Sequence, residues 1–227
     1  MPDDTAGQPP VAPRPPGAGR RPRGPRPETI ARREEILRAA ARVFGAKGYH
    51  QGSLAEVAEQ VGITHAGVLH HFGSKDRLLT AVLEHRDRSD VEHLDPQHIP
   101  EGLDLFRHLV ATAAANAERP GLVQTYTVLT GESVTDGHPA APWVAERFRV
   151  LRADIATALR AVAGTDVDLD AAALDRAASS IIAVMDGLQV QWLLAPDAVD
   201  LARSTAFAVE AILAATLAGA DRPRPLG

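Results

Sequence analysis

Residues 53–72 read SLAEVAEQVGITHAGVLHHF, a stretch that predicts two short helices joined by a tight turn. Ser53 is a good N-cap for the first helix, and Glu56, three residues later, completes a capping box. Gly62 ends that helix, because glycine tolerates the positive φ that a tight turn requires. Thr64 can then cap the second helix. The stretch therefore predicts a helix, a turn and a second helix in immediate succession.

The apolar residues of this stretch are spaced to close a small core between the two helices, and Ala58 is small where they cross. These core residues are Val57, Val61, Ile63 and Val68. The arrangement is typical of a helix-turn-helix, whose second helix, here about residues 64–71, enters the DNA major groove. An ordinary helical hairpin inside a bundle has the same pattern, so the pattern alone leaves both interpretations open.

Helical patterns continue on both sides of this pair. Upstream, apolar residues recur at helical spacing from Glu28 to a stop at Lys47-Gly48. Downstream, Ser74 can cap a long helix that starts at Lys75, and most of the chain beyond it shows helical periodicity. No alternating Val/Ile/Thr run bounded by turns occurs. We therefore predict an all-α fold with an N-terminal three-helix head and a C-terminal helical domain.

The composition favours a soluble cytoplasmic protein. Of the 227 residues, 45% are apolar, which is ample for a core, and cysteine is absent, which excludes disulfides and thiolate metal sites. No uncharged apolar run approaches the roughly 20 residues that span a bilayer, and the N-terminus lacks the apolar core of a signal peptide. We expect no membrane association.

Charge is distributed unevenly along the chain. Residues 1–80 carry 12 Lys and Arg against 8 Asp and Glu, a net charge of +4, whereas residues 81–227 have a net charge of −9. An anionic partner would therefore bind the front of the chain. Residues 1–27 hold nine of the 17 prolines and five arginines, which predicts a disordered arm that is either a solvated tail or a DNA contact. Residues 221–227 are expected to be a flexible tail.

Three consecutive segments together resemble the TetR family of transcriptional regulators. They are FGAKGY at residues 44–49, the helix pair at 53–72, and HHFGSKDRLL at 70–79, and the resemblance covers about residues 28–83. It implies a helix-turn-helix DNA-binding domain at 28–74 and a helical ligand-binding and dimerisation domain at 75–220. It also implies a homodimeric regulator, most often a repressor that a small-molecule effector releases from a palindromic double-stranded DNA operator.

The resemblance also implies roles for individual residues of the head. Four residues that open the recognition helix would face base edges, and these are Thr64, His65, Ala66 and Gly67. Ser53, His71 and Lys75 match positions that contact phosphate, while Phe72 matches a core aromatic. Leu69 departs from the family, which usually has a phosphate-binding tyrosine there, and we include His70 as a residue that could compensate. The three histidines lack the spacing of a zinc site, so we expect no metal.

The second half offers aromatic and polar residues for a small-molecule pocket, although plain core packing is the alternative for each of them. The candidates for ligand binding are Phe106, His108, Tyr126, Trp143, Phe148, Gln189 and Trp192. Residues 170–194 and 198–218 form the last two helices, with apolar and small residues over much of their circumference. The resemblance implies that these two helices form a four-helix dimer interface.

Two other classes of protein compete with the regulator. The sequence contains no G-x-S-x-G, P-loop, H-E-x-x-H or dinucleotide-binding motif, so we expect neither catalytic residues nor a cofactor. A ligand-binding or scaffolding dimer with a degenerate head is the other alternative, and Leu69 is its best support. Retention on a palindromic DNA would separate it from a regulator.

Overall fold

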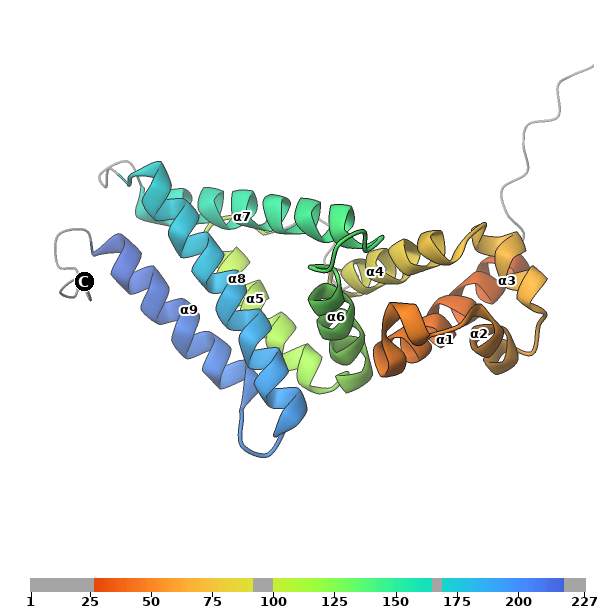
Figure 1. The fold of residues 1–227 in the computed structure, drawn as a ribbon. Helices are drawn as coiled ribbons and strands as arrows, with labels where there is room; N and C mark the ends of the chain where they lie inside the picture. Colours follow the sequence, from red (N-terminus) through yellow and green to blue (C-terminus); the bar gives the residue numbers. More distant parts are fainter. Residues whose placement is uncertain (1–26, 92–99, 165–168, 219–227) are drawn as a thin grey trace, which may run out of the picture.

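The computed structural model describes residues 27–91, 100–164 and 169–218, and within these ranges the chain forms nine α-helices and no strand. The predicted arm, apart from Pro27, and the predicted tail lie outside the described residues. In Figure 1, α2 and α3 lie at one end of the molecule and α8 and α9 at the other. The helices are α1 (Pro27–Gln51), α2 (Leu54–Val61), α3 (His65–Phe72), α4 (Lys75–Val91), α5 (Leu103–Ala117), α6 (Pro120–Glu132), α7 (Ala141–Ala163), α8 (Ala171–Leu194) and α9 (Leu201–Leu217).

The predicted all-α fold is confirmed, and the local stop and start signals lie where the sequence placed them. Gly48 has a φ of 73° and breaks the helical backbone near the end of α1. Gly62 has a φ of 69° at the end of α2. The Ser74 hydroxyl accepts the backbone N–H of Arg77 at 3.1 Å and so caps α4. The glycines act through their own backbone preferences and Ser74 through a hydrogen bond to a residue three positions away, which is why the boundaries could be predicted from local sequence.

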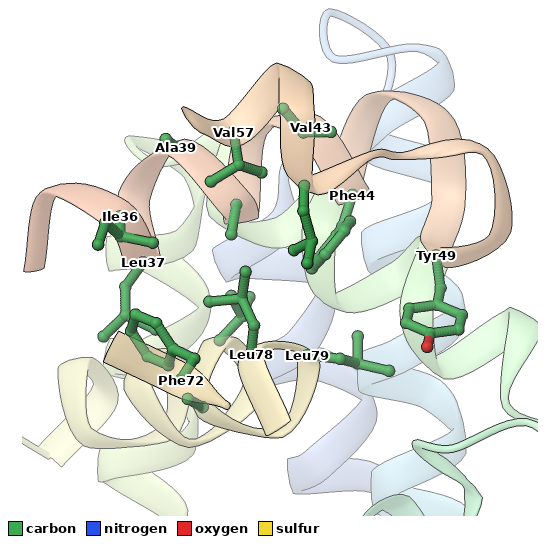
Figure 2. Packing of buried hydrophobic residues seen from close by; sticks show 14 of the residues in the cluster. Ile36, Leu37, Ala39, Val43, Phe44, Tyr49, Val57, Phe72, Leu78 and Leu79 are labelled. Carbon is green, nitrogen blue, oxygen red and sulfur yellow. The ribbon is translucent and has the colours of Figure 1, made fainter. Parts of the chain in front are cut away.

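The core of the head extends into the second half of the chain. Phe44, Val57, Leu78 and Leu79 are fully buried in one cluster, and Leu129 of α6 belongs to the same cluster. Figure 2 shows side chains from α1, Val57 from α2, and Phe72, Leu78 and Leu79 pointing toward one another. Residues of α1, α4 and α6 share this close-packed core, so a shift of the head would disturb α6.

The remaining helices pack around a second cluster that contains Leu105, Leu159, Leu174 and Ile181. The helix α8 lies beside both α7 and α9 in this bundle (Figure 1). By length and composition alone, α8 is the one described helix apolar enough to cross a membrane. It carries Asp175, Arg176 and Asp186, however, and Leu174, Ile181 and Trp192 pack it against the rest of the chain.

Candidate functional site

The helix pair of residues 53–72 forms through reciprocal caps. Ser53 Oγ accepts the backbone N–H of Glu56 at 3.1 Å, and the Glu56 carboxylate accepts the Ser53 N–H at 3.2 Å. Lys47 pairs with the same carboxylate, which lowers the pKa of Glu56. The N-terminus of α2 therefore already holds one anionic group, and Ser53 retains its hydroxyl hydrogen for a phosphate oxygen.

The first turn of α3 exposes the side chains that were expected to face bases. Thr64 Oγ1 accepts the backbone N–H of Gly67 at 3.1 Å and thereby starts the helix at His65, one residue later than predicted. His65 and Ala66 are exposed, whereas Val68 is fully buried in the core of the head. The helix thus buries one face and presents the opposite face, with His65 and Ala66, to solvent.

Two arginines of α1 hold the ends of the helix pair. Arg32 donates to the carbonyl oxygen of Val61 at 3.2 Å, and Arg33 donates to that of His71 at 2.8 Å while lying 4.0 Å from the Phe72 ring centroid. The last carbonyls of a helix lack intrahelical partners and carry partial negative charge, so both contacts stabilise helix C-termini. Sequence analysis missed these arginines, because no local pattern shows that side chains of α1 reach the ends of both helices.

The two histidines at the end of α3 differ in environment. His70 is exposed, and its ring lies 5.8 Å from the half-buried His71 ring. Burial lowers the pKa of His71, and the charges of His70 and Arg33 lower it further. Near neutral pH, His71 is therefore a neutral N–H donor, and the positive charge beside it is that of the α1 arginines.

Lys75 is fixed at the turn between α3 and α4. Its ammonium donates to the His50 carbonyl oxygen at 3.3 Å and lies 4.4 Å from the Tyr49 ring centroid. The Tyr49 hydroxyl in turn donates to Asp76. Lys75 is half-buried by these contacts, so its charge is held in one place beside α3.

A cavity of about 500 Å³ lies behind the head, between α4, α5, α6, α7 and α8. His108, Tyr126, Trp143 and Gln189, four of the seven residues expected at a ligand site, line it. The other three lie elsewhere. Phe106 is buried among α5, α7 and α8 residues, Phe148 packs against the core of the head, and Trp192 is buried with Val123 and Leu201.

The cavity also carries charged residues that sequence analysis did not find. Arg86 of α4 and Arg147 of α7 pair with opposite oxygens of Asp87 at 3.1 and 3.2 Å. Their guanidinium carbons lie 4.3 and 5.3 Å from the Tyr126 ring centroid. Burial raises the pKa of Asp186, which also lines the cavity, to about 6, although both arginines act in the opposite direction. These residues come from four helices, and only the packing of those helices brings them together.

Two family models match this chain. Residues 36–82 match the model of bacterial regulatory proteins of the tetR family. Residues 104–218, half of the chain, match the model of the C-terminal part of BetI-type transcriptional repressors. The first match spans the helix-turn-helix, and the second spans α5 to α9, with most of the cavity wall.

Curated relatives and solved structures agree with these matches. The HTH-type transcriptional regulator TtgR of Pseudomonas putida is 28% identical over 74% of this chain and 83% of its own length. The HTH-type transcriptional regulator BetI of Brucella abortus is 27% identical over 83% of this chain and 92% of its own. SmeT, the repressor of the Stenotrophomonas maltophilia multidrug efflux pump SmeDEF, has the same fold with a TM-score of 0.64 at 23% identity, covering 88% of this chain and all of SmeT. A complex of SmeT with triclosan superposes equally well, with a TM-score of 0.64. The chain therefore belongs to the TetR family and is a DNA-binding transcriptional regulator.

Proposed function

We propose that this regulator is a homodimeric repressor that leaves a palindromic operator when a small molecule fills the cavity. One observation carries the proposal: α4 and α6 contribute both to the core of the head and to the wall of the cavity. Leu79 of α4 and Leu129 of α6 are fully buried in the head cluster, whereas Arg86 and Tyr126 of the same two helices line the cavity. A molecule that repositions these helices would therefore reposition the head.

The link between α6 and the head is polar as well as apolar. Thr125 Oγ1 donates to the Ala41 carbonyl oxygen at 2.9 Å, and the Glu132 carboxylate accepts the backbone N–H of Tyr49 at 2.7 Å. Tyr126, next to Thr125, faces the cavity. Filling the cavity against Tyr126 would thus act on α1 through adjacent residues of one helix, and a ligand shifts the equilibrium only by its differential affinity for the two positions.

The proposed DNA contacts lie on the exposed side of the head. His65 and Ala66, with Thr64 and Gly67, would meet base edges in the major groove, whereas Ser53, His70, His71 and Lys75 would meet phosphates. The family's tyrosine contact is absent, since Leu69 packs partly buried against the head core. We propose that Lys75 and the α1 arginines compensate with positive charge.

The proposed dimer interface is the outer face of α8 and α9. Ala183, Gly187, Val190 and Leu194 form one stripe of small and apolar residues along α8, and Leu194 is 82% exposed. Phe207 on α9 is 76% exposed. Ile181 and its inward stripe are buried within the chain, so the outer stripe is the surface that a second copy would cover.

The proposed DNA contacts can be tested by comparing a residue expected to contact a base, His65, with one expected to contact a phosphate, Lys75. A preferred duplex is first selected from a random pool, and binding of each variant to it and to a scrambled duplex is then titrated with salt by fluorescence anisotropy. His65→Ala should cost about 1–3 kcal/mol on the preferred duplex and much less on the scrambled one. Lys75→Ala should weaken both duplexes alike and reduce the salt slope by about one, whereas Lys75→Arg should keep the slope. Equal losses on both duplexes for His65→Ala would contradict base reading, and failure to select any duplex would favour the degenerate head.

The dimer interface can be tested with one exposed position and one buried position. Phe207→Asp should convert a dimer of the 24.1 kDa chain into a folded monomer, measured by light scattering and circular dichroism. Ile181→Arg should unfold the chain instead, because it places an unpaired charge in the core. A wild-type protein that is monomeric at micromolar concentration would contradict the interface.

A further inference from the structure

Two carboxylates of the cavity wall lack a direct hydrogen-bond or ion-pair partner, although Arg86 and Arg147 act on one of them, Asp186, from a longer distance. Asp154 of α7 and Asp186 of α8 both line the cavity, and neither forms a hydrogen bond or an ion pair with any residue that the structure describes. Glu146, another acid of the wall, pairs with Arg149 at 2.6 Å. The positive groups Arg86 and Arg147 share Asp87 and lie against the Tyr126 ring. Arg88 of α4 also lines the cavity, but it is exposed to solvent. The half-buried charges of the wall without a direct partner are therefore those of the two aspartates.

A second feature of the wall lies one helical turn from Asp186. Gln189 of α8 is only 5% exposed, and its Oε1 atom has no hydrogen-bond partner among the described residues. Residues three apart on a helix are neighbours, so Asp186 and Gln189 place two acceptors side by side on the cavity face of α8. A buried acceptor without a donor is costly, and a donor supplied by a ligand removes that cost.

Burial disfavours the ionised form of Asp186. Burial raises its pKa to about 6 even though Arg147 and Arg86 favour its ionised form. A carboxylate in a cleft whose pKa is raised in this way is a candidate ligand-binding group. A cation beside the carboxylate would favour the ionised form and supply the opposite charge that burial demands.

The rest of the wall suits the apolar part of a ligand. Trp143, Leu109, Val150, Ile182 and Met185 line the same cavity. The cavity thus combines a mostly apolar wall with a few hydrogen-bond acceptors in one place, which is the usual composition of a site for a drug-sized molecule.

We infer that the effector of the proposed function, on which this assignment rests, is an amphipathic organic cation with N–H donors, held by Asp186 and Gln189. A primary ammonium, amidinium or guanidinium group would donate to the Asp186 carboxylate and to Gln189 Oε1. The hydrocarbon part would lie on Trp143 and the aliphatic wall. A quaternary ammonium would satisfy the charge of Asp186 and leave Gln189 without a donor.

Four pyrene compounds with the same ring system test this assignment: 1-pyrenemethylamine, pyrenemethyl-trimethylammonium, 1-pyrenemethanol and 1-pyrenecarboxylate. Binding to the full chain is measured by pyrene fluorescence at neutral pH, and release of the selected duplex is followed by anisotropy. The amine should bind most tightly, the trimethylammonium next, the alcohol at least tenfold more weakly than the amine, and the carboxylate least. The order of duplex release should be the same.

Asp186→Asn is the decisive variant, with Asp154→Asn as its matched control in the same cavity. Asp186→Asn should remove most of the preference for the amine over the alcohol, whereas Asp154→Asn should keep it within about threefold. Thermal unfolding checks that both variants are folded. Equal binding of the amine and the alcohol, tightest binding of the carboxylate, or an unchanged preference in Asp186→Asn would overturn the assignment.

The same experiment separates the assignment from the proposed function. If the alcohol or the carboxylate releases the duplex and the cations do not, the cavity is an effector site and the inferred charge of the effector is wrong. If none of the four compounds binds, the inferred effector class is wrong, whereas the proposed function fails only if no duplex can be selected or the wild-type protein is monomeric.

Discussion

The head and the cavity-bearing half of this molecule are built in opposite ways. In the head, polar groups find partners within a few residues or on α1, as the reciprocal caps of Ser53 and Glu56 and the contacts of Arg32 and Arg33 show. In the second half, buried polar atoms of Thr112, Asn116 and Gln189 on the cavity wall lack partners among the described residues. Unsatisfied buried groups cost stability, so their concentration at one cavity supports the effector site of the proposed function.

The contrast extends to packing. The core of the head is closed, with side chains such as Phe44 and Leu79 fully buried. The second half leaves a cavity of about 500 Å³ inside and apolar residues such as Leu194 and Phe207 outside. The head is thus closely packed by its own chain. In the proposed function, a ligand fills the cavity of the second half and a second copy covers its outer apolar residues. The following predictions test this difference, from the largest expected effect to the smallest.

The same leucine deletion should be costly in the head and mild in the cavity wall. Leu79→Ala removes a fully buried side chain and should lower the free energy of unfolding by about 3–5 kcal/mol. Leu109→Ala, at a partly buried position that faces the existing cavity, should cost about 1–2 kcal/mol. Urea unfolding measures both values. Equal losses would show that the second half packs as tightly as the head.

Alanine substitutions of two glycines, one in α1 and one in α6, should change the free energy of unfolding in opposite directions. Gly48 has a φ of 73°, and a Cβ atom there would meet the Glu132 carboxylate, so Gly48→Ala should destabilise the chain by about 2–3 kcal/mol. Gly131 lies in α6 with open space around it, and Gly131→Ala should stabilise by about 0.5 kcal/mol. Thermal unfolding compares the two. A neutral Gly48→Ala would show that the Glu132–Tyr49 contact is dispensable.

Replacement of Asp186 should stabilise the chain in a pH-dependent manner. Because burial raises the pKa of Asp186 from 3.8 to about 6, the folded state binds more protons than the unfolded state between these values. The ionisation of buried Asp186 therefore lowers the free energy of unfolding fully above about pH 6 and not at all below about pH 4. Asp186→Asn should be more stable by about 2 kcal/mol at pH 7.5, with the gain vanishing toward pH 4. A gain that is constant with pH would contradict the buried ionisation.

The helix caps of the head should contribute the least. Thr64→Ala removes the acceptor for the Gly67 N–H and should cost about 1 kcal/mol, whereas Thr64→Ser, which keeps the hydroxyl, should cost only a few tenths. Both values can be measured by urea unfolding. A loss of equal size in Thr64→Ser would point to the methyl group rather than the cap.

The sequence alone determined the fold class and the course of the head. Ser53, Gly62 and Thr64 act on backbone groups within four residues of themselves, so the starts and ends of the two short helices do not depend on distant contacts. The segments at 44–49, 53–72 and 70–79 together indicated the family, which the matching family model over residues 36–82 confirms.

Only the tertiary structure decided what surrounds the cavity and which face of each helix is covered. Phe106, Phe148 and Trp192 are no less apolar than Trp143, and sequence periodicity could not tell which of them packs in a core. Arg86, Arg147 and Asp186 lie on three helices, far apart in the chain, so their juxtaposition has no local signal. Similarly, the apolar and small residues of 170–194 predicted that α8 is covered on several sides, but not which side this chain covers and which a second copy would cover. Local rules specify helices and turns through backbone chemistry, whereas a binding site depends on the angles at which the helices pack.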